Sequence, residues 1–300
     1  MAKIKPYAGS LKGSLGEITY RQTQSGIVMY PKVHPVPSHT KKQLYIRCRM
    51  GNICNFNRAF NGCLTHSFED KVGNHSSYNM LLKYNTMEGS TQVYLTRLEA
   101  RQNACVVAPY VISMGSLPTV GSTVEGEGLC LSDLSLGDLD IDEDTTVGEF
   151  TLSLMAHNPQ YEFMTGDEMT FFCIQQDVKD SLPCAEAYYY NLRLDASNEA
   201  KLWSAVRHYG FHNVGGRLGS AEGLPEGGYA WVLTRHYANG TYAVSSERLA
   251  CDNPILASYT SEEAFERSAK SYGGYTEALL RPDGKSHNSG DLPMRTPSKP

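Results

Sequence analysis

The sequence lacks any apolar run that could cross a membrane. A membrane helix needs about 20 consecutive apolar residues, and the longest runs here are far shorter. Residues 1–6 contain two lysines but are not followed by an apolar segment, so they do not form a secretory signal. We therefore expect no membrane partner, and synthesis in a reducing cytoplasm without a signal peptide.

The sequence also lacks the short motifs of common catalytic sites. It contains neither a Gly-x-Ser-x-Gly elbow nor a phosphate-binding glycine loop. The glycine cluster from Gly215 to Gly219 has the wrong internal spacing and is interpreted as a loop. With nine histidines and many serines, pairings of Ser or Cys with His arise by chance. We therefore predict no catalytic residue, no cofactor and a protein that is not an enzyme.

No Cys-x-x-Cys pair occurs among the eight cysteines, which argues against a structural zinc site. Cys54, Cys63 and His66, with Cys48 nearby, have the closest spacing to metal ligands, but a lone Cys-x-x-His pair is weak evidence for zinc. The chain is long and has no export signal, so a disulfide framework is not expected. We predict reduced thiols that mostly fill core positions, and no metal site.

The acidic segment 133–149 has a second, minor interpretation. Its aspartates alternate from Asp138 to Asp144, and Glu149 stands eleven positions after Asp138, as the last ligand of an EF-hand loop does. However, Glu143 replaces the turn glycine that such a loop requires. The favoured interpretation is an exposed strand with carboxylates on its wet face, and calcium binding is the alternative.

The amino-acid composition is typical of a globular protein. Of 300 residues, 41% are hydrophobic and 20% are charged, which suits one large domain or two ordinary ones. Nineteen tyrosines and twenty-seven glycines favour strands and turns. The charge is divided unevenly: residues 1–101 hold fourteen Lys and Arg against five Asp and Glu, whereas residues 102–300 hold thirteen against twenty-seven. The chain therefore has a basic front and an acidic body.

The basic front is predicted to be a β-hairpin followed by a helix. Gly9, Gly13 and Gly16 precede an alternating run, and the turn at Gly26 leads to a second run that ends at Tyr30. The prolines from 31 to 37 predict an extended connector. Apolar residues at three- and four-residue steps then predict a helix from Ser38 to Leu64.

The rest of the chain is predicted to be mainly β (α+β), with a β-sandwich-like body. Strands are expected over 105–114, 150–156, 168–178 and 186–194, and a hairpin over 229–249 around Asn239-Gly240. Helices are expected over 76–86, from Ser197 to a stop at Gly210, and from a capping box at Thr260 to Gly273. The predicted domains are a basic hairpin-and-helix arm, 1–104, a β-rich body, 105–280, and an extended tail, 281–300.

The candidate binding residues lie in the basic arm. They are Arg21, Lys32, Lys41, Lys42, Arg47, Arg49 and Arg58. They suit contact with the acidic body of a neighbouring subunit best, a solvated helix face second, and nucleic acid third, because no known nucleic-acid module accompanies them. The tyrosines 188–190 are interpreted as core packing for one face, with contact to a sugar or a partner for the other.

The first sixty residues resemble the amino-terminal pattern of small uncharacterised proteins of Bacteroidota and their phages. The resemblance rests on the opening residues 1–5, the glycine spacing at Gly9, Gly13 and Gly16, and Gly26 before the second strand. It continues through the proline-rich exit and Thr40-x-x-Gln43. It implies a non-enzymatic, β-rich protein associated with a virion or another assembly.

We therefore interpret the chain as a structural or assembly protein of a bacteriophage virion, capsid- or tail-associated. Its basic arm contacts neighbouring subunits in a homo-oligomer or a larger assembly. The alternative is a module that binds nucleic acid or carbohydrate.

Overall fold

The chain divides into two compact units, Met1–Thr40 and Lys41–Pro300. The structure, a computed structural model, describes residues 2–4, 13–23, 26–32, 41–60, 62, 66–69, 76–87, 89–206 and 208–273. The sequence predictions at Gly9, 33–37, Ser38, Leu64 and the tail 281–300 lie outside these ranges. The predicted helix after the hairpin belongs to the second unit, although sequence analysis grouped it with the basic arm.

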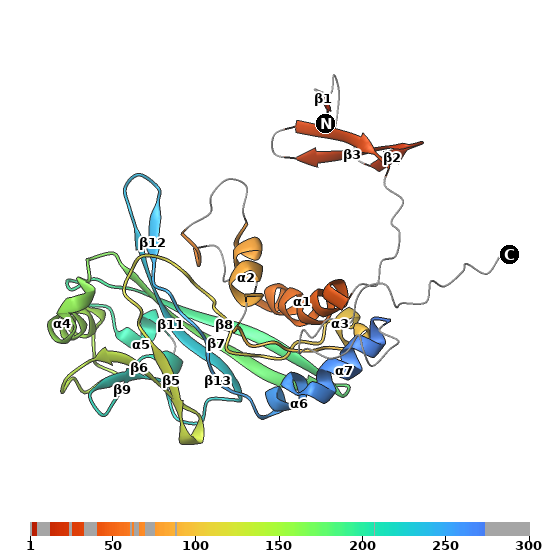
Figure 1. The fold of residues 1–300 in the computed structure, drawn as a ribbon. Coiled ribbons are helices and arrows are strands. Elements are labelled where there is room, and N and C mark those ends of the chain that lie inside the picture. Colours follow the sequence, from red (N-terminus) through yellow and green to blue (C-terminus); the bar gives the residue numbers. More distant parts are fainter. Residues whose placement is uncertain are drawn as a thin grey trace. The chain divides into compact units, whose positions relative to one another are not determined.

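The first unit is an antiparallel four-stranded sheet in the order β1-β4-β3-β2 (Figure 1). Its strands are β1 (Ala2–Ile4), β2 (Gly13–Leu15), β3 (Ile18–Thr23) and β4 (Gly26–Pro31). The predicted hairpin is confirmed, with Thr23 paired to Gly26. Gly16 takes a φ of 57° in the tight turn between β2 and β3, a conformation that favours glycine.

The cross-strand register makes this sheet amphipathic. Leu15 pairs with Ile18, and Tyr20 pairs with Met29, so these side chains share one face. Ser14 pairs with Thr19, and Arg21 pairs with Val28, on the opposite face. One face is therefore apolar and the other is largely polar.

The second unit is built around a long sheet in the order β12-β11-β7-β8, with β13 also paired to β11 (Figure 1). The strands are β7 (Glu168–Lys179), β8 (Leu182–Arg193), β11 (Gly227–His236), β12 (Tyr242–Val244) and β13 (Ala250–Asp252). Every residue of β11 except His236 is buried, so this strand is covered on both faces. The predicted strands over 168–178 and 186–194 and the hairpin over 229–249 are confirmed.

A second antiparallel sheet, in the order β5-β6-β10-β9, covers one face of the long sheet. Its strands are β5 (Ser122–Glu125), β6 (Leu129–Ser135), β9 (His212–Val214) and β10 (Arg217–Gly219). Leu134 and Leu218 of this sheet share a buried cluster with Phe171 and Trp231 of the long sheet. The predicted sandwich-like, mainly β architecture is confirmed, because the named sheets are antiparallel and two of them pack through one core.

Helices cover the other face of the long sheet (Figure 1). They are α1 (Lys41–Phe60), α2 (Ser77–Asn85), α3 (Arg97–Arg101) and α6 (Ala257–Thr260), and α7 (Glu262–Ser271) packs on the outside of α1 through Phe265 and Ala269. Phe60 of α1 meets Phe172 of β7 edge-on, with ring centroids 5.2 Å apart. Phe172 and Phe171 point to opposite faces, as strand alternation requires, so β7 contributes to both cores.

Outside the acidic segment, three predictions of regular elements are wrong. Residues 150–156 lie in helix α4 (Val147–His157), which a capping box between Thr146 and Glu149 begins. Residues 105–114 are extended but form isolated bridges rather than a regular strand. The helix expected from Ser197 is reduced to α5 (Leu202–Ala205), and Gly210 does not take a left-handed conformation.

The helices predicted over 76–86 and from Thr260 to Gly273 agree with α2 and α7 to within about a residue, whereas α1 covers Lys41–Phe60 of the helix predicted from Ser38 to Leu64. Ser76 caps α2, whereas α7 is capped by Ser261 rather than Thr260. Short 3-10 segments connect other elements: η2 (Gly126–Gly128), η3 (Pro159–Tyr161), η4 (His208–Gly210) and η5 (Pro254–Leu256). Within the described ranges, no helix is both long and apolar enough to span a bilayer.

Candidate functional site

The predicted basic residues fall into two groups, one in each unit. Arg21 and Lys32 are exposed in the first unit. On α1, the side chains of Lys42, Arg47 and Arg58 are exposed. Lys41 is the first residue of α1, and its side chain lies outside the described part of the structure. Arg47 and Arg58 are eleven residues apart, which is close to three full helical turns, so they share one face of α1.

Arg49 differs from the other candidates because its guanidinium group is engaged within its own chain. It donates to the side-chain oxygen of Gln92 at 2.5 Å and to the backbone oxygens of Thr86 and Met87 at 2.6 and 3.2 Å. It also lies over the ring of Tyr45, 5.0 Å from the centroid. Arg49 therefore fixes the loop after α2 against α1.

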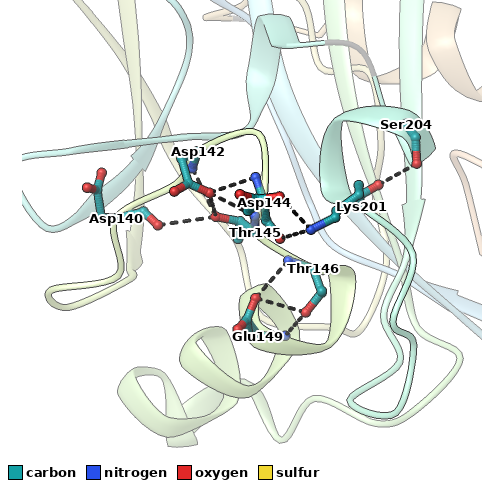
Figure 2. Close-up of polar contacts among 8 residues, drawn as sticks. All are labelled: Asp140, Asp142, Asp144, Thr145, Thr146, Glu149, Lys201 and Ser204. Atoms are coloured by element: carbon teal, nitrogen blue, oxygen red, sulfur yellow. Dashed lines mark hydrogen bonds and ion pairs between the residues drawn. The ribbon is translucent and has the colours of Figure 1, made fainter.

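The acidic segment forms a loop and a helix start rather than an exposed strand (Figure 2). Strand β6 ends at Ser135, and the loop that follows turns at Asp142. The Asp142 carboxylate accepts from the backbone nitrogens of Asp144 and Thr145 at 2.8 and 2.9 Å. These bonds to the charged form lower the pKa of Asp142, chiefly the one from the Asp144 backbone.

Glu149 has a structural role at the start of α4. Its carboxylate accepts from the Thr146 backbone at 2.8 Å and thereby starts α4, and this bond lowers its pKa (Figure 2). Lys201 neutralises Asp144 at 2.9 Å. Among the residues that the structure describes, no group of three or more acidic, His or Cys side chains could hold a metal ion. The remaining exposed carboxylates make this loop an acidic surface.

The cysteines within the described ranges are free thiols, as predicted. Burial raises the pKa of Cys105, Cys130 and Cys251 to about 12, so these thiols stay protonated at neutral pH. Cys54 lies 3.2 Å from the hydroxyl of Tyr78. Cys63 lies outside the described residues.

A small cavity of about 140 Å³ opens where α1 ends over the long sheet. Its floor is Phe172 and Val232, and its lining continues along the same face of three strands. The polar lining residues from these strands are Glu168, Thr170, Tyr189, Asn191 and Thr234. Gly62, His66 and Ser67, which follow α1 in the chain, line the remaining side.

Strand register explains why these side chains meet. Thr170 pairs with Asn191 on β8 and with Val232 on β11, so all three lie on the helix-covered face of the sheet, beyond the end of α1. Asn191 donates to the Glu168 carboxylate at 3.1 Å, and Nε2 of His236 lies 3.5 Å from the same oxygen, Oε2.

His66, which lines the cavity, belongs to an aromatic cluster. The His66 ring meets those of His236 and Tyr242 edge-on, with centroids 5.1 and 4.9 Å apart. The side chain of Glu168 is 30% exposed, so its carboxylate faces a partly desolvated space. The cavity therefore combines one carboxylate with hydroxyl, amide and aromatic groups.

Two residues that line this cavity, Tyr189 and His66, were singled out from the sequence for other roles. Glu168, Asn191 and the neighbouring His236 were not. Asn191 and His236 are 23 and 68 positions from Glu168 in sequence and become its neighbours only through strand pairing. The period-two pattern of β7 could have placed Glu168 and Thr170 on one face, but not opposite Asn191.

Comparison with protein-family models, curated proteins and solved structures found no match.

Proposed function

We propose that this chain is a non-enzymatic assembly protein whose first unit docks on a second copy. The observation that carries the proposal is the exposed β2–β3 end of the apolar face of the amino-terminal sheet. Leu15 is 75% exposed and Ile18 is 38% exposed, although both lie on that face. Among the side chains described in this unit, only Ile27 is buried. A sheet with so little buried surface gains stability by covering its apolar face with another surface.

Charge complementarity supports a second copy as the partner. Residues 1–40 hold five Lys and Arg against one Glu. The second unit exposes an acidic surface that includes Asp133, Asp138, Asp140, Asp142 and Glu143. Opposite potentials on two surfaces of one chain favour contact between copies and fix its register.

The setting that we propose is a bacteriophage virion, in a capsid- or tail-associated position. The support for it is the resemblance of the first sixty residues to Bacteroidota phage proteins. The second candidate function is nucleic-acid binding, which the exposed pair Arg47 and Arg58 on one face of α1 favours.

Two adjacent residues of β2 give a matched test of docking. Leu15→Glu places a charge on the apolar face, whereas Ser14→Glu places the same charge on the polar face of the same strand. Molar mass is measured by size exclusion with light scattering at low and high salt. We expect the wild type and Ser14→Glu to form oligomers, and Leu15→Glu to be monomeric.

Deletion of residues 1–40 extends this test to the whole first unit. We expect the deleted protein to be monomeric. We also expect the wild-type assembly to weaken as salt is added, because salt screens the attraction between its basic and acidic surfaces. A wild type that is monomeric in both salts and unchanged by the deletion would contradict the proposal. Salt-sensitive DNA or RNA binding that Arg47→Gln and Arg58→Gln abolish would favour the second candidate.

A further inference from the structure

The cavity beside Glu168 has no role in the proposed docking of the first unit, and its size limits what it can hold. Its volume is about 140 Å³, whereas pockets for drug-sized ligands measure about 300–1,000 Å³. One water occupies about 30 Å³ in the liquid, so the cavity holds a group of about four or five heavy atoms. A nucleotide or a sugar chain is too large to be enclosed there.

The charge of the lining selects a cation over an anion. Glu168 supplies the formal negative charge, and the other polar lining groups are hydroxyls, an amide and an imidazole. Asn191 and His236 both approach Oε2 of Glu168, and no described residue is bonded to Oε1. A positively charged donor can therefore meet Oε1 without displacing either neighbour.

The shape of the lining favours a planar cation. Tyr189 is 55% exposed and stands beside Phe172, with ring centroids 6.4 Å apart. Such a ring can stack against a guanidinium group, which attracts it through the cation–π interaction. The hydroxyls of Thr170 and Thr234 can accept from the remaining N–H groups of a planar fork.

We propose that this cavity binds a guanidinium group, contributed by an arginine side chain of a partner polypeptide. The head group enters the cavity, pairs with Glu168 and stacks on Tyr189, while the partner's backbone stays outside. The inference is independent of the amino-terminal unit, because the cavity lies wholly within the second unit. It survives or fails separately from the docking proposal.

The test uses the full chain and N-acetyl-L-arginine-N′-methylamide as the probe, with the citrulline analogue as its uncharged isostere. Binding is followed through the ¹⁵N-labelled side-chain amide of Asn191 in NMR titrations. We expect saturable binding of the arginine probe, and about tenfold or more weaker binding of the citrulline probe, because a charge-assisted hydrogen bond is lost. Equal affinity for the two probes would overturn the proposal.

Three variants test the carboxylate and the ring that the proposal names. Glu168→Gln should weaken the arginine probe at least about tenfold, whereas Glu186→Gln, on the same β7–β8 ladder opposite Gln175, should leave binding unchanged. Tyr189→Leu removes the ring on which the guanidinium group stacks and should weaken binding by about two- to fivefold, so the test does not depend on Glu168→Gln alone. Undiminished binding to Glu168→Gln, or to Tyr189→Leu, contradicts the proposal.

A last pair of ligands tests whether the cavity binds an arginine side chain of a polypeptide or a free alkylguanidine. An arginine-centred pentapeptide is compared with agmatine, which carries the same head group without a polypeptide. Binding of the peptide as tightly as agmatine, or more tightly, supports a partner side chain. Agmatine binding more than about tenfold tighter would assign the cavity to a small molecule instead.

Discussion

The two units of this chain both consist of antiparallel strands, but they bury their apolar residues to very different extents. In the second unit, β7 and β11 contribute side chains to a core on each face, and Tyr229, Trp231 and Leu233 are fully buried. In the first unit, four strands share one buried side chain, Ile27, among those described. The apolar face of the first unit is thus buried at Ile27 but exposed at Leu15 and Ile18.

This difference indicates where each unit obtains its stability. A strand that is covered on both faces is stabilised within its own chain, at about 25 cal/mol per Å² of apolar surface removed from water. An amphipathic sheet with one exposed apolar face has that surface still in water. The same kind of side chain should therefore contribute to unfolding in one unit and to association in the other.

The largest effect on the free energy of unfolding is expected from one of two matched leucine substitutions. Leu233→Ala removes a side chain that is 0% exposed, and should lower the free energy of unfolding by about 2–5 kcal/mol. Leu15→Ala removes one from the exposed face and should change it by less than about 0.5 kcal/mol. Urea unfolding at a protein concentration below that of assembly measures both.

The contrast between the two units fails if both leucine substitutions lower the free energy of unfolding equally. A loss for Leu15→Ala as large as for Leu233→Ala would mean that the first unit is stabilised within its own chain. A shift in the association midpoint for Leu15→Ala, without a shift in unfolding, would sharpen the contrast.

The next effect is a pH response of the second unit. Glu247 is 2% exposed, and its carboxylate accepts from the backbone of Val120 and Gly121 at 2.7 and 3.3 Å. Burial raises its pKa from 4.5 to about 7. Between these two values the folded state binds more protons than the unfolded state, so stability falls as the pH rises from about 4.5 to 7.

The loss over this window should total about 3 kcal/mol, at about 1.4 kcal/mol for each pH unit of the shift. Glu247→Gln should abolish this part of the slope. Glu149→Gln is the control. The pKa of Glu149 is lowered in the folded state, so this residue changes the stability only at pH values below this range. Unfolding midpoints at pH 5 to 8 measure the slope, and an unchanged slope in Glu247→Gln contradicts the assignment.

Local sequence signals predicted much of the fold. The turn residues at Gly16 and Gly26, the helical spacing of α1 and the hairpin at Asn239-Gly240 all act over a few positions, and the structure contains each element. Helix α4 was missed because Phe150 and Leu154 fit a buried strand as well as a buried helix. The capping box from Thr146 to Glu149 was the signal that distinguishes them.

The cavity could not be predicted in the same way. Glu168, Asn191 and His236 meet because β7 pairs with β8 on one side and with β11 on the other. No local pattern reports the register of two long strands. The acidic surface was recognised from composition, but its loop geometry depends on hydrogen bonds from Asp142 that alternation alone does not reveal.

The smallest expected effect concerns residues 105–114, where sequence analysis expected a strand. Asn52 of α1 replaces a neighbouring strand there: its oxygen accepts from the Val106 N–H at 2.8 Å, and its nitrogen donates to the Val106 oxygen at 2.8 Å. Asn85 of α2 makes the same pair of bonds to Val111. Amide side chains thus satisfy buried backbone groups that would otherwise need a sheet.

Asn52→Ala should therefore cost about 1–3 kcal/mol of stability, because it leaves buried backbone groups unsatisfied. Asn57→Ala on the same helix is the matched control, because the buried Asn57 oxygen has no hydrogen-bond partner in the described structure. It should cost less than Asn52→Ala. Hydrogen exchange of the Val106 amide should accelerate in Asn52→Ala alone. Equal costs for the two variants, with Val106 still protected, would show that packing rather than the amide bonds holds this segment in place.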